Sequence, residues 1–457
     1  MTGSGHFLWW CGPRGDRPRD ARWTEIGEEA FQEKERRITG RHHLPGPVPD
    51  WAEDLFRVAR AVFIADKYVR RTSVRDRWTR RISLAVPVTE HERWQSAAVR
   101  THLTALLQIL TGDLWNVDFR PLTGHHVEEA MVSPDDPRAS EVALFSGGLD
   151  SLSWAATRSC ADDPRPLLLV MFREIGLLRL QQRVYQAVKR LDGPRPVMLL
   201  PMSQTPAGDG SGLRLETSSR TRGLLYAAGA IRAATAHGVG TVHIPENGQL
   251  ALNPPLTPAR SAACSTRSVH PWTLCRLNSL VTAVGDAGSA VRVVNPWARL
   301  TKGEVCVAGR DAGLTPSDLE STLSCGKPPA RRSGGPPIAN CGVCFPCLVR
   351  RSGLLHANGT DGTQYEALPW ADDLPFGRGT DWRALQRWLL GRYTLTDVLA
   401  DTPLPLDADP GAALNLVRRG REELARLLQI SDAAEAADAA QAGSSSHQAA
   451  LVVTDGI

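Results

Sequence analysis

The sequence predicts an α/β protein whose centre is a mainly parallel, doubly wound sheet. From residue 141 to about residue 314, short apolar runs of strand length alternate with longer amphipathic stretches of helix length. This alternation is typical of parallel strands covered by helices on both faces. A Ser-Gly-Gly turn directly follows the first apolar run. We expect a small α+β domain before this sheet and helices after it.

Changes in pattern divide the 457 residues into five segments. Composition is that of an ordinary globular protein, with 42% hydrophobic and 22% charged residues. The expected segments are an irregular N-terminal segment (1–45), an accessory α+β domain (46–140), the central α/β domain (141–355), a helical C-terminal region (356–431) and a disordered, low-complexity tail (432–457).

In the accessory domain, apolar residues at helical spacing predict helices over 50–71 and 92–112, with a strand over 78–88 between them. The stretch between Lys67 and Arg81 is the most basic part of the chain. It is either a solvated, partly salt-bridged helix end or a patch that contacts phosphate.

In the central domain the expected strands and helices alternate regularly, and ligands of such sheets bind beyond the carboxyl ends of the strands. Two further helices are expected in the C-terminal region, at 381–393 and 412–430. The central strands are expected at 141–145, 166–172, 196–200, 241–245 and 291–296, and the helices from 151 and at 177–191, 220–238, 272–288 and 302–314.

Bulk composition excludes several classes of protein. The net charge of +4 is small for this length and gives no general case for a nucleic-acid binder. No apolar run reaches the ~20 residues that span a bilayer. The N-terminus lacks the basic lead-in of a signal peptide, and nine cysteines without such a signal indicate a reducing compartment. We therefore expect a cytoplasmic protein.

The turn formed by Ser146, Gly147, Gly148, Leu149, Asp150 and Ser151 is the strongest functional signal. Paired glycines let the backbone approach a ligand closely, and the amides at the start of the following helix favour an anion. The two serines add hydroxyl donors. Asp150 would repel a bare phosphate, so we expect Mg²⁺ between them. The spacing is neither that of a Walker loop nor that of a dinucleotide-binding turn. The alternative is a glycine-rich turn without a ligand.

Four cysteines near the end of the central domain form the second signal. Cys341, Cys344 and Cys347 stand at two-residue spacing, and Cys325 lies upstream. Four thiolates suit a closed, structural Zn²⁺ site. An iron–sulfur cluster and four unligated thiols are the alternatives, although the usual bacterial iron–sulfur spacing continues with a fourth cysteine that is absent here.

The Ser-Gly-Gly-Leu-Asp-Ser turn resembles the signature of the PP-loop (N-type ATP pyrophosphatase) superfamily. That resemblance implies that ATP binds on this turn and that AMP is placed on an acyl or amide oxygen. With the Cys-Gly-x-Cys-x-x-Cys-x-x-Arg run that ends at Arg350, residues 141–355 resemble the 7-cyano-7-deazaguanine synthase (QueC-like) branch. Lys302, at the start of an expected helix, matches a family lysine and could meet the polyphosphate. Arg220 matches a family arginine that precedes a long Ala-rich helix, and this match makes it a candidate for binding the substrate.

The chain also departs from that family. Its substrate loop is absent, and the replacing segments carry polar side chains that could bind substrate. Glu246 and Asn247 follow an expected strand and could read the donor edge of a purine-like ring. The remaining candidates could hold a carboxylate or the AMP phosphate, or could only stabilise their own loop. They are Ser265, Thr266, Arg267 and His270.

With its extra N- and C-terminal segments, the chain resembles the QueC-like proteins of Qat-type antiphage defence systems. The resemblance implies a ligase that adenylates a 7-deazaguanine carboxylate and passes it to ammonia or to an amine of a partner protein. Two alternatives stay open. A tRNA-thiolating PP-loop enzyme would need a catalytic cysteine pair and a basic face. A scaffold of a defence complex would bind the nucleotide without catalysis.

Overall fold

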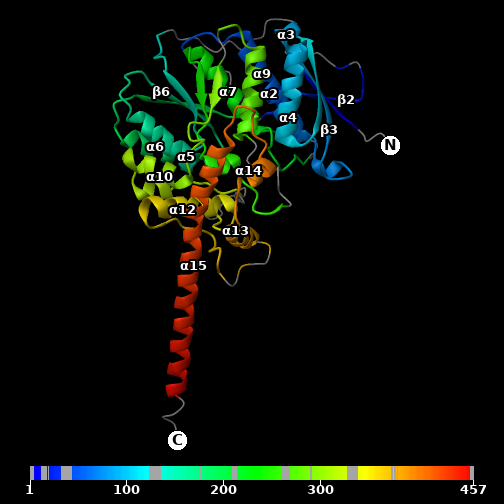
Figure 1. Cartoon of the computed structure of the whole chain (residues 1–457). Helices are drawn as coiled ribbons and strands as arrows, with labels where there is room; N and C mark the ends of the chain where they lie inside the picture. The colour runs from blue at the N-terminus through cyan, green and yellow to red at the C-terminus, as the bar shows by residue number, and fades with distance from the viewer. Residues whose placement is uncertain are drawn as a thin grey trace.

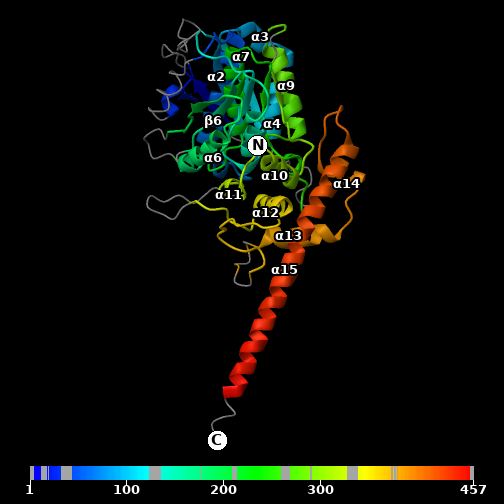
Figure 2. The same ribbon diagram turned by 90° about the vertical axis from the view of Figure 1, so that its left-hand side faces the viewer.

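The computed structural model is an α/β fold with two parallel sheets and C-terminal helices (Figures 1 and 2). Among the described residues, none of the helices combines the length and the apolar character needed to cross a membrane. The structure describes residues 5–11, 18, 20–31, 44–122, 135–174, 176–207, 214–258, 268–288, 291–326, 338–371, 374, 377 and 379–452, and for 432–452 only the course of the backbone.

The first sheet has four parallel strands in the order β2-β1-β3-β4. Its strands are β1 (His6–Trp10), β2 (Trp23–Ile26), β3 (Arg81–Val88) and β4 (Leu114–Pro121). Two of them lie in the segment 1–45, for which the sequence predicted no regular structure. Because every pairing is parallel, this unit is α/β in type, whereas an α+β arrangement was expected. Its helices are α2 (Asp50–Tyr68), α3 (His91–Gln95) and α4 (Ala97–Thr111).

The second sheet has five parallel strands in the order β7-β6-β5-β8-β9 and confirms the expected parallel central sheet. Each strand falls within or close to its expected range: β5 (Glu141–Leu144), β6 (Leu167–Phe172), β7 (Val197–Met202), β8 (Thr241–His243) and β9 (Arg292–Val294). Its helices are α5 (Leu149–Ser159), α6 (Leu178–Arg190), α7 (Arg222–His237), α8 (Gly248–Leu252), α9 (Pro271–Val284) and α10 (Lys302–Asp311).

Alternate side chains of β6 face two different cores. Leu168 and Val170 belong to a core that runs through α7 and α9 to α2, α4 and the first sheet. Leu167 and Leu169 belong to a second core with α5, α6 and α10. A strand covered on both faces reads as a continuous apolar run. The two sheets therefore share one hydrophobic core through a double layer of helices.

The C-terminal region packs beneath the second sheet and ends in one long helix (Figure 2). After α10 the central domain has α11 (Pro316–Glu320) and α12 (Phe345–Asn358), and the later segment has α13 (Thr380–Leu390), α14 (Leu395–Asp401) and α15 (Pro410–Val452). The disordered tail expected from residue 432 is instead helical as far as Val452. The many alanines there explain this, because alanine has the highest helix propensity.

A buried ion network closes the first unit and joins it to the second. Arg80 is fully buried, and its guanidinium lies 2.5 Å from both Asp66 Oδ1 and Asp113 Oδ2. Arg71 forms a second bridge to Asp113, at 2.9 Å. Asp66 Oδ2 also accepts hydrogen bonds from the amide and hydroxyl of Thr221, just before α7. Part of the basic stretch is therefore neither a solvated helix end nor a phosphate patch but an internal support.

We predict that Arg80→Met destabilises the protein by about 3–5 kcal/mol, because removing the cation leaves buried carboxylates uncompensated. Urea denaturation followed by circular dichroism measures the change. Arg81→Met is the matched control, since Arg81 is the next residue, exposed at the start of β3. Equal midpoints for the two variants would contradict this role for the network.

Candidate functional site

The candidate site lies where the winding of the second sheet reverses. Strands β5 and β8 are neighbours, and the chain leaves them toward opposite sides of the strand order. Parallel sheets open a crevice at the carboxyl ends of such a pair. The Ser-Gly-Gly turn follows β5, and Glu246 and Asn247 follow β8. The fold thus brings together two segments that the sequence predicted to bind ligand.

The turn after β5 needs its first glycine. Gly147 has φ +78°, a left-handed conformation, and a Cβ there would lie 3.2 Å from the Cα of Gln181. Ser146 Oγ accepts a hydrogen bond from the Gly148 amide at 3.1 Å and lies 3.2 Å from Ser151 Oγ. No described side chain caps the N-terminus of α5. Its first amides therefore remain suited to an anion.

A buried ion pair stands beside this turn. Lys302 Nζ, fully buried at the start of α10, donates to Asp150 Oδ2 at 2.6 Å. Asn247 Nδ2 lies 3.3 Å from the same oxygen and 2.9 Å from Glu246 Oε1, so it bridges the two carboxylates. Among the described residues, no donor reaches the buried Asp150 Oδ1. One carboxylate oxygen therefore remains available to a cation.

Burial raises the pKa of Glu246 well above its ordinary value, and the nearby Asp150 carboxylate raises this pKa further. The Lys302 ammonium opposes the shift. Glu246 thus faces Asp150, at the end of the site where phosphates would lie. Its expected contact with the edge of a purine-like ring stays a prediction.

Three further residues hold the site, and the sequence had not assigned them a role in it. Gln181 donates to Ser146 O at 3.2 Å and to Phe172 O at 3.0 Å. Trp297 Nε1 donates to Asp150 O at 3.2 Å, and Asn295 Oδ1 accepts from the Glu246 amide at 3.1 Å. Gln181 could have been identified from the sequence, because it is a polar residue on the otherwise apolar, buried face of α6.

Two predicted substrate residues, Arg220 and His270, make the following contacts away from this cluster. Arg220 donates to Thr111 O at 2.8 Å and lies over the Trp78 ring, so the contacts shown link it to the first unit. His270 caps α9 by accepting from the Trp272 amide at 3.2 Å. Burial lowers the pKa of His270 to about 4, so its ring supplies no positive charge near neutral pH. Ser265, Thr266 and Arg267 lie outside the described residues.

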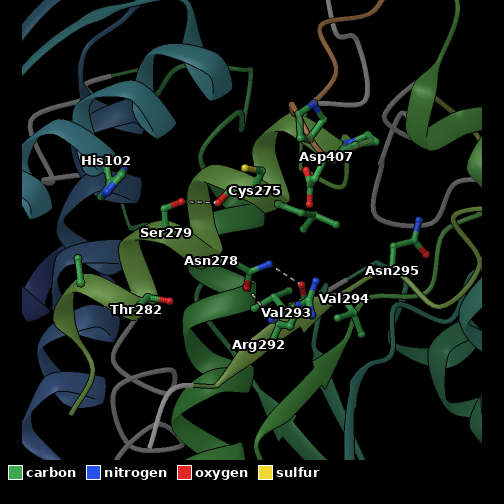
Figure 3. Close-up of a pocket in the computed structure, with 14 residues that line it drawn as sticks. His102, Cys275, Asn278, Ser279, Thr282, Arg292, Val293, Val294, Asn295 and Asp407 are labelled. Atoms are coloured by element: carbon green, nitrogen blue, oxygen red, sulfur yellow. Dashed lines mark hydrogen bonds between the residues drawn. The ribbon is translucent and has the colours of Figure 1, made fainter. Parts of the chain in front are cut away.

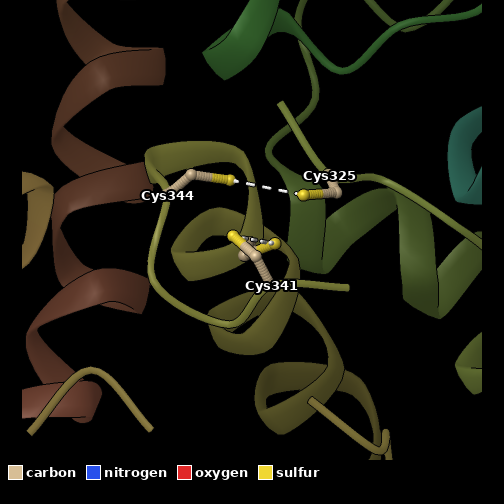
Figure 4. Close-up of side chains that lie close together, drawn as sticks. Cys325, Cys341 and Cys344 are labelled. Atoms are coloured by element: carbon tan, nitrogen blue, oxygen red, sulfur yellow. Dashed lines mark hydrogen bonds between the residues drawn. The ribbon is translucent and has the colours of Figure 1, made fainter. Parts of the chain in front are cut away.

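The four predicted metal ligands meet at the start of α12 (Figure 4). Their sulfur atoms all lie within 4.8 Å of one another. Cys325 Sγ is 3.9 Å from Cys344 Sγ, and Cys341 Sγ is 3.8 Å from Cys347 Sγ. A tetrahedron with Zn–S bonds of ~2.3 Å has edges of ~3.8 Å. The cluster therefore fits a metal such as zinc. Arg350 is buried nearby and donates to Thr322 Oγ1 at 2.6 Å, which is a structural role.

A cavity of about 680 Å³ lies between α9 and the edge strand β9 (Figure 3). Asn278 of α9 points toward this strand. Its amide donates to Val293 O at 2.9 Å and accepts from Val293 N at 2.8 Å. Asn295 lines the cavity and also binds the Glu246 amide. The cavity thus borders the candidate site.

No family model matches the chain, and neither a curated protein nor a solved structure matches it. The resemblance to the PP-loop proteins therefore rests on the motifs quoted above.

We predict that Glu246→Gln changes the pH dependence of stability. A carboxyl whose pKa is raised on folding contributes stability at low pH that is lost as the pH rises through its folded pKa. Without nucleotide and Mg²⁺, the melting temperature of the wild type should fall relative to that of Glu246→Gln as the pH rises above about 4.5. Differential scanning fluorimetry across the pH range measures this difference. Parallel curves for the two proteins would refute it, and Glu92→Gln, at an exposed site, is the control.

We predict about one zinc ion per chain, measured by elemental analysis of the purified protein. Cys347→Ser should lose the metal and lower the melting temperature, because Cys347 is fully buried within the cluster. Cys160→Ser, at an exposed thiol outside the cluster, should keep it. A brown, iron-containing preparation would instead favour an iron–sulfur cluster.

Proposed function

We propose that the chain is an ATP-dependent ligase of the PP-loop type, which activates a carboxylate by adenylation and transfers the acyl group to an amine. The observation that carries the proposal is the buried Asp150–Lys302 pair beside a left-handed Gly147 turn, at the reversal point of a parallel sheet. This arrangement combines backbone amides, a fixed cation and a carboxylate, as nucleotide chemistry requires.

The turn would bind the β- and γ-phosphates of ATP. The uncapped amides of α5 and the hydroxyls of Ser146 and Ser151 are donors on one side of the site. Lys302 is held rigidly by its burial and by Asp150, so its charge is preorganised at the polyphosphate. The site thus favours the charge that develops on departing pyrophosphate.

The donor set also suits Mg²⁺. This ion prefers carboxylate oxygens together with substrate phosphates. Asp150 would hold it through Oδ1, which no described donor reaches, and Glu246 lies close beside it. When bound, the ion would neutralise phosphate charge. Lys302 pairs with Asp150 Oδ2 and so fixes the direction of the other carboxylate oxygen.

The proposed adenylation and acyl transfer require no covalent enzyme intermediate. A carboxylate oxygen of the substrate attacks the α-phosphorus, the bond from that phosphorus to the bridging oxygen breaks, and pyrophosphate leaves. An amine then attacks the acyl carbon, AMP leaves with the former carboxylate oxygen, and the amine loses a proton. The chain's contribution is to position the reactants and to stabilise the leaving diphosphate.

The motif resemblance supports a 7-deazaguanine acid as the substrate. The cavity beside Asn295 provides space next to the Glu246 segment for such a ring or for the acceptor amine. Ammonia would give an amide, which a second ATP cycle could dehydrate to a nitrile. An amine on a partner protein would give a conjugate, consistent with a role in antiphage defence.

We predict that the wild type, incubated with ATP, Mg²⁺, 7-carboxy-7-deazaguanine and ammonium, releases AMP and pyrophosphate, and that Asp150→Asn lowers the rate by about 10²-fold or more. The variant loses the negative charge that pairs with Lys302 and faces the metal. Chromatography of the nucleotides measures the rate. Asp162→Asn, at an exposed position, is the control and should keep full activity.

Other outcomes would replace the proposal. ATP binding without AMP release, with any acid and amine supplied, would indicate a scaffold. Turnover only with tRNA and a sulfur donor would indicate a thiolating enzyme. Pyrophosphate release by Asp150→Asn at the wild-type rate would contradict the assigned role of this carboxylate.

A further inference from the structure

Helix α15, far along the chain from the phosphate turn, contacts two of the segments at the candidate site: the one that carries Glu246 and Asn247, and the start of α10. Gln249, two residues after Asn247, donates to Gly420 O at 3.3 Å. A Cβ on Gly248 would lie 2.5 Å from Leu416 Cδ2, so α15 packs directly against the start of α8. Thus α15 supports the segment that carries Glu246 and Asn247.

The second contact is at the N-terminus of α10, where Lys302 is the first helical residue. Glu423 is buried and accepts a hydrogen bond from the Gly303 amide at 3.0 Å and another from the Thr301 hydroxyl. These two partners flank Lys302. A Cβ on Gly303 would lie 2.5 Å from Glu423 Oε1, so only glycine permits this approach.

Other side chains reinforce the same junction. Arg419 of α15 bridges to Glu304 of α10 at 2.8 Å and donates to Arg299 O at 2.7 Å. On the opposite side, a Cβ on Gly353 of α12 would lie 2.4 Å from Lys302 Cγ. The lysine stem therefore packs closely against α12, and Glu423 holds the first turn of α10 in place.

We propose that Glu423 is a positioning residue, which fixes the first turn of α10 so that Lys302 meets Asp150 at the nucleotide site. The C-terminal helix is then part of the site rather than an appended segment. The consequence for nucleotide binding rests on the proposed function, whereas the effect on α10 does not.

Because Glu423 is buried among charged groups, the stability of its junction with α10 should depend on pH. The pKa of Glu423 is raised to about 7, chiefly by burial and also by Glu304, although the hydrogen bonds from Thr301 and Gly303 and the charge of Arg426 oppose the rise. His356 of α12 faces the carboxyl at 3.8 Å. Burial and Arg426 lower the pKa of His356.

Because the pKa of Glu423 is raised in the folded protein, its carboxyl group stabilises the docking of α15 at low pH. The folded junction binds the proton more tightly than the opened junction, so docking of α15 weakens as the pH rises through about 7. A protonated Glu423 can accept from the Gly303 amide and donate to Thr301 Oγ1. Glutamine can make the same two bonds and does not titrate. Glu423→Gln should therefore preserve the junction and remove its pH dependence.

The test is hydrogen exchange of the backbone amides over residues 302–305, read by mass spectrometry in the full-length protein, together with ATP–Mg²⁺ affinity by calorimetry. Glu423→Ala should speed exchange and weaken ATP binding by about tenfold each, since hydrogen bonds to a charged group are lost. Glu423→Gln should stay within about threefold of the wild type. Glu422→Ala, at the exposed neighbouring position, should change neither.

The intrinsic rate of amide exchange rises with pH in any protein. In the wild type, exchange over residues 302–305 should rise by more than this as the pH passes about 7, whereas in Glu423→Gln it should show only the intrinsic rise. Unchanged exchange in Glu423→Ala would overturn the proposal whether or not ATP binds. So would failure of Glu423→Gln to restore the junction. If the wild type binds no ATP but Glu423→Ala still loosens α10, the proposed function fails and the positioning role stands.

Discussion

The buried pair between Lys302 and Asp150 is the interaction on which the rest of the site depends. Burying two opposite charges is favourable only with good geometry and additional hydrogen bonds. The chain supplies both, because the 2.6 Å contact is flanked by the Asn247 amide and the lysine stem is enclosed by Gly353. The two partners are separated by 152 residues, so this pair also fastens α10 to the turn after β5. Asn247, Trp297 and Gly353 come from three other segments and contact one partner of the pair or the other.

The surrounding architecture is layered, and its rigidity comes from shared cores. Leu168 and Val170 on one face of β6, and Leu167 and Leu169 on the other, place the same strand in two cores. The first sheet joins one of these cores through α2 and α4. The first sheet thus packs, through these helices, into the same core as the strands that carry the candidate site.

The sequence predicted the second sheet and the turn well, because apolar runs and a glycine pair are local signals. It did not reveal β1 and β2, which are only 5 and 4 residues long and pair with each other and with a distant strand. Nor could spacing indicate that Lys302 meets Asp150, or that Arg220 stacks on Trp78, since both contacts are set by tertiary packing. The cysteine cluster was predictable because three of its ligands are close in sequence.

The amide of Asn278 has a consequence for solubility. An outermost strand offers unpaired backbone groups to any other extended chain and can nucleate intermolecular sheets. At Val293 the side chain of Asn278 occupies both the N–H and the C=O that would otherwise be available. A single helix residue thereby satisfies the backbone groups through which another strand could pair at Val293.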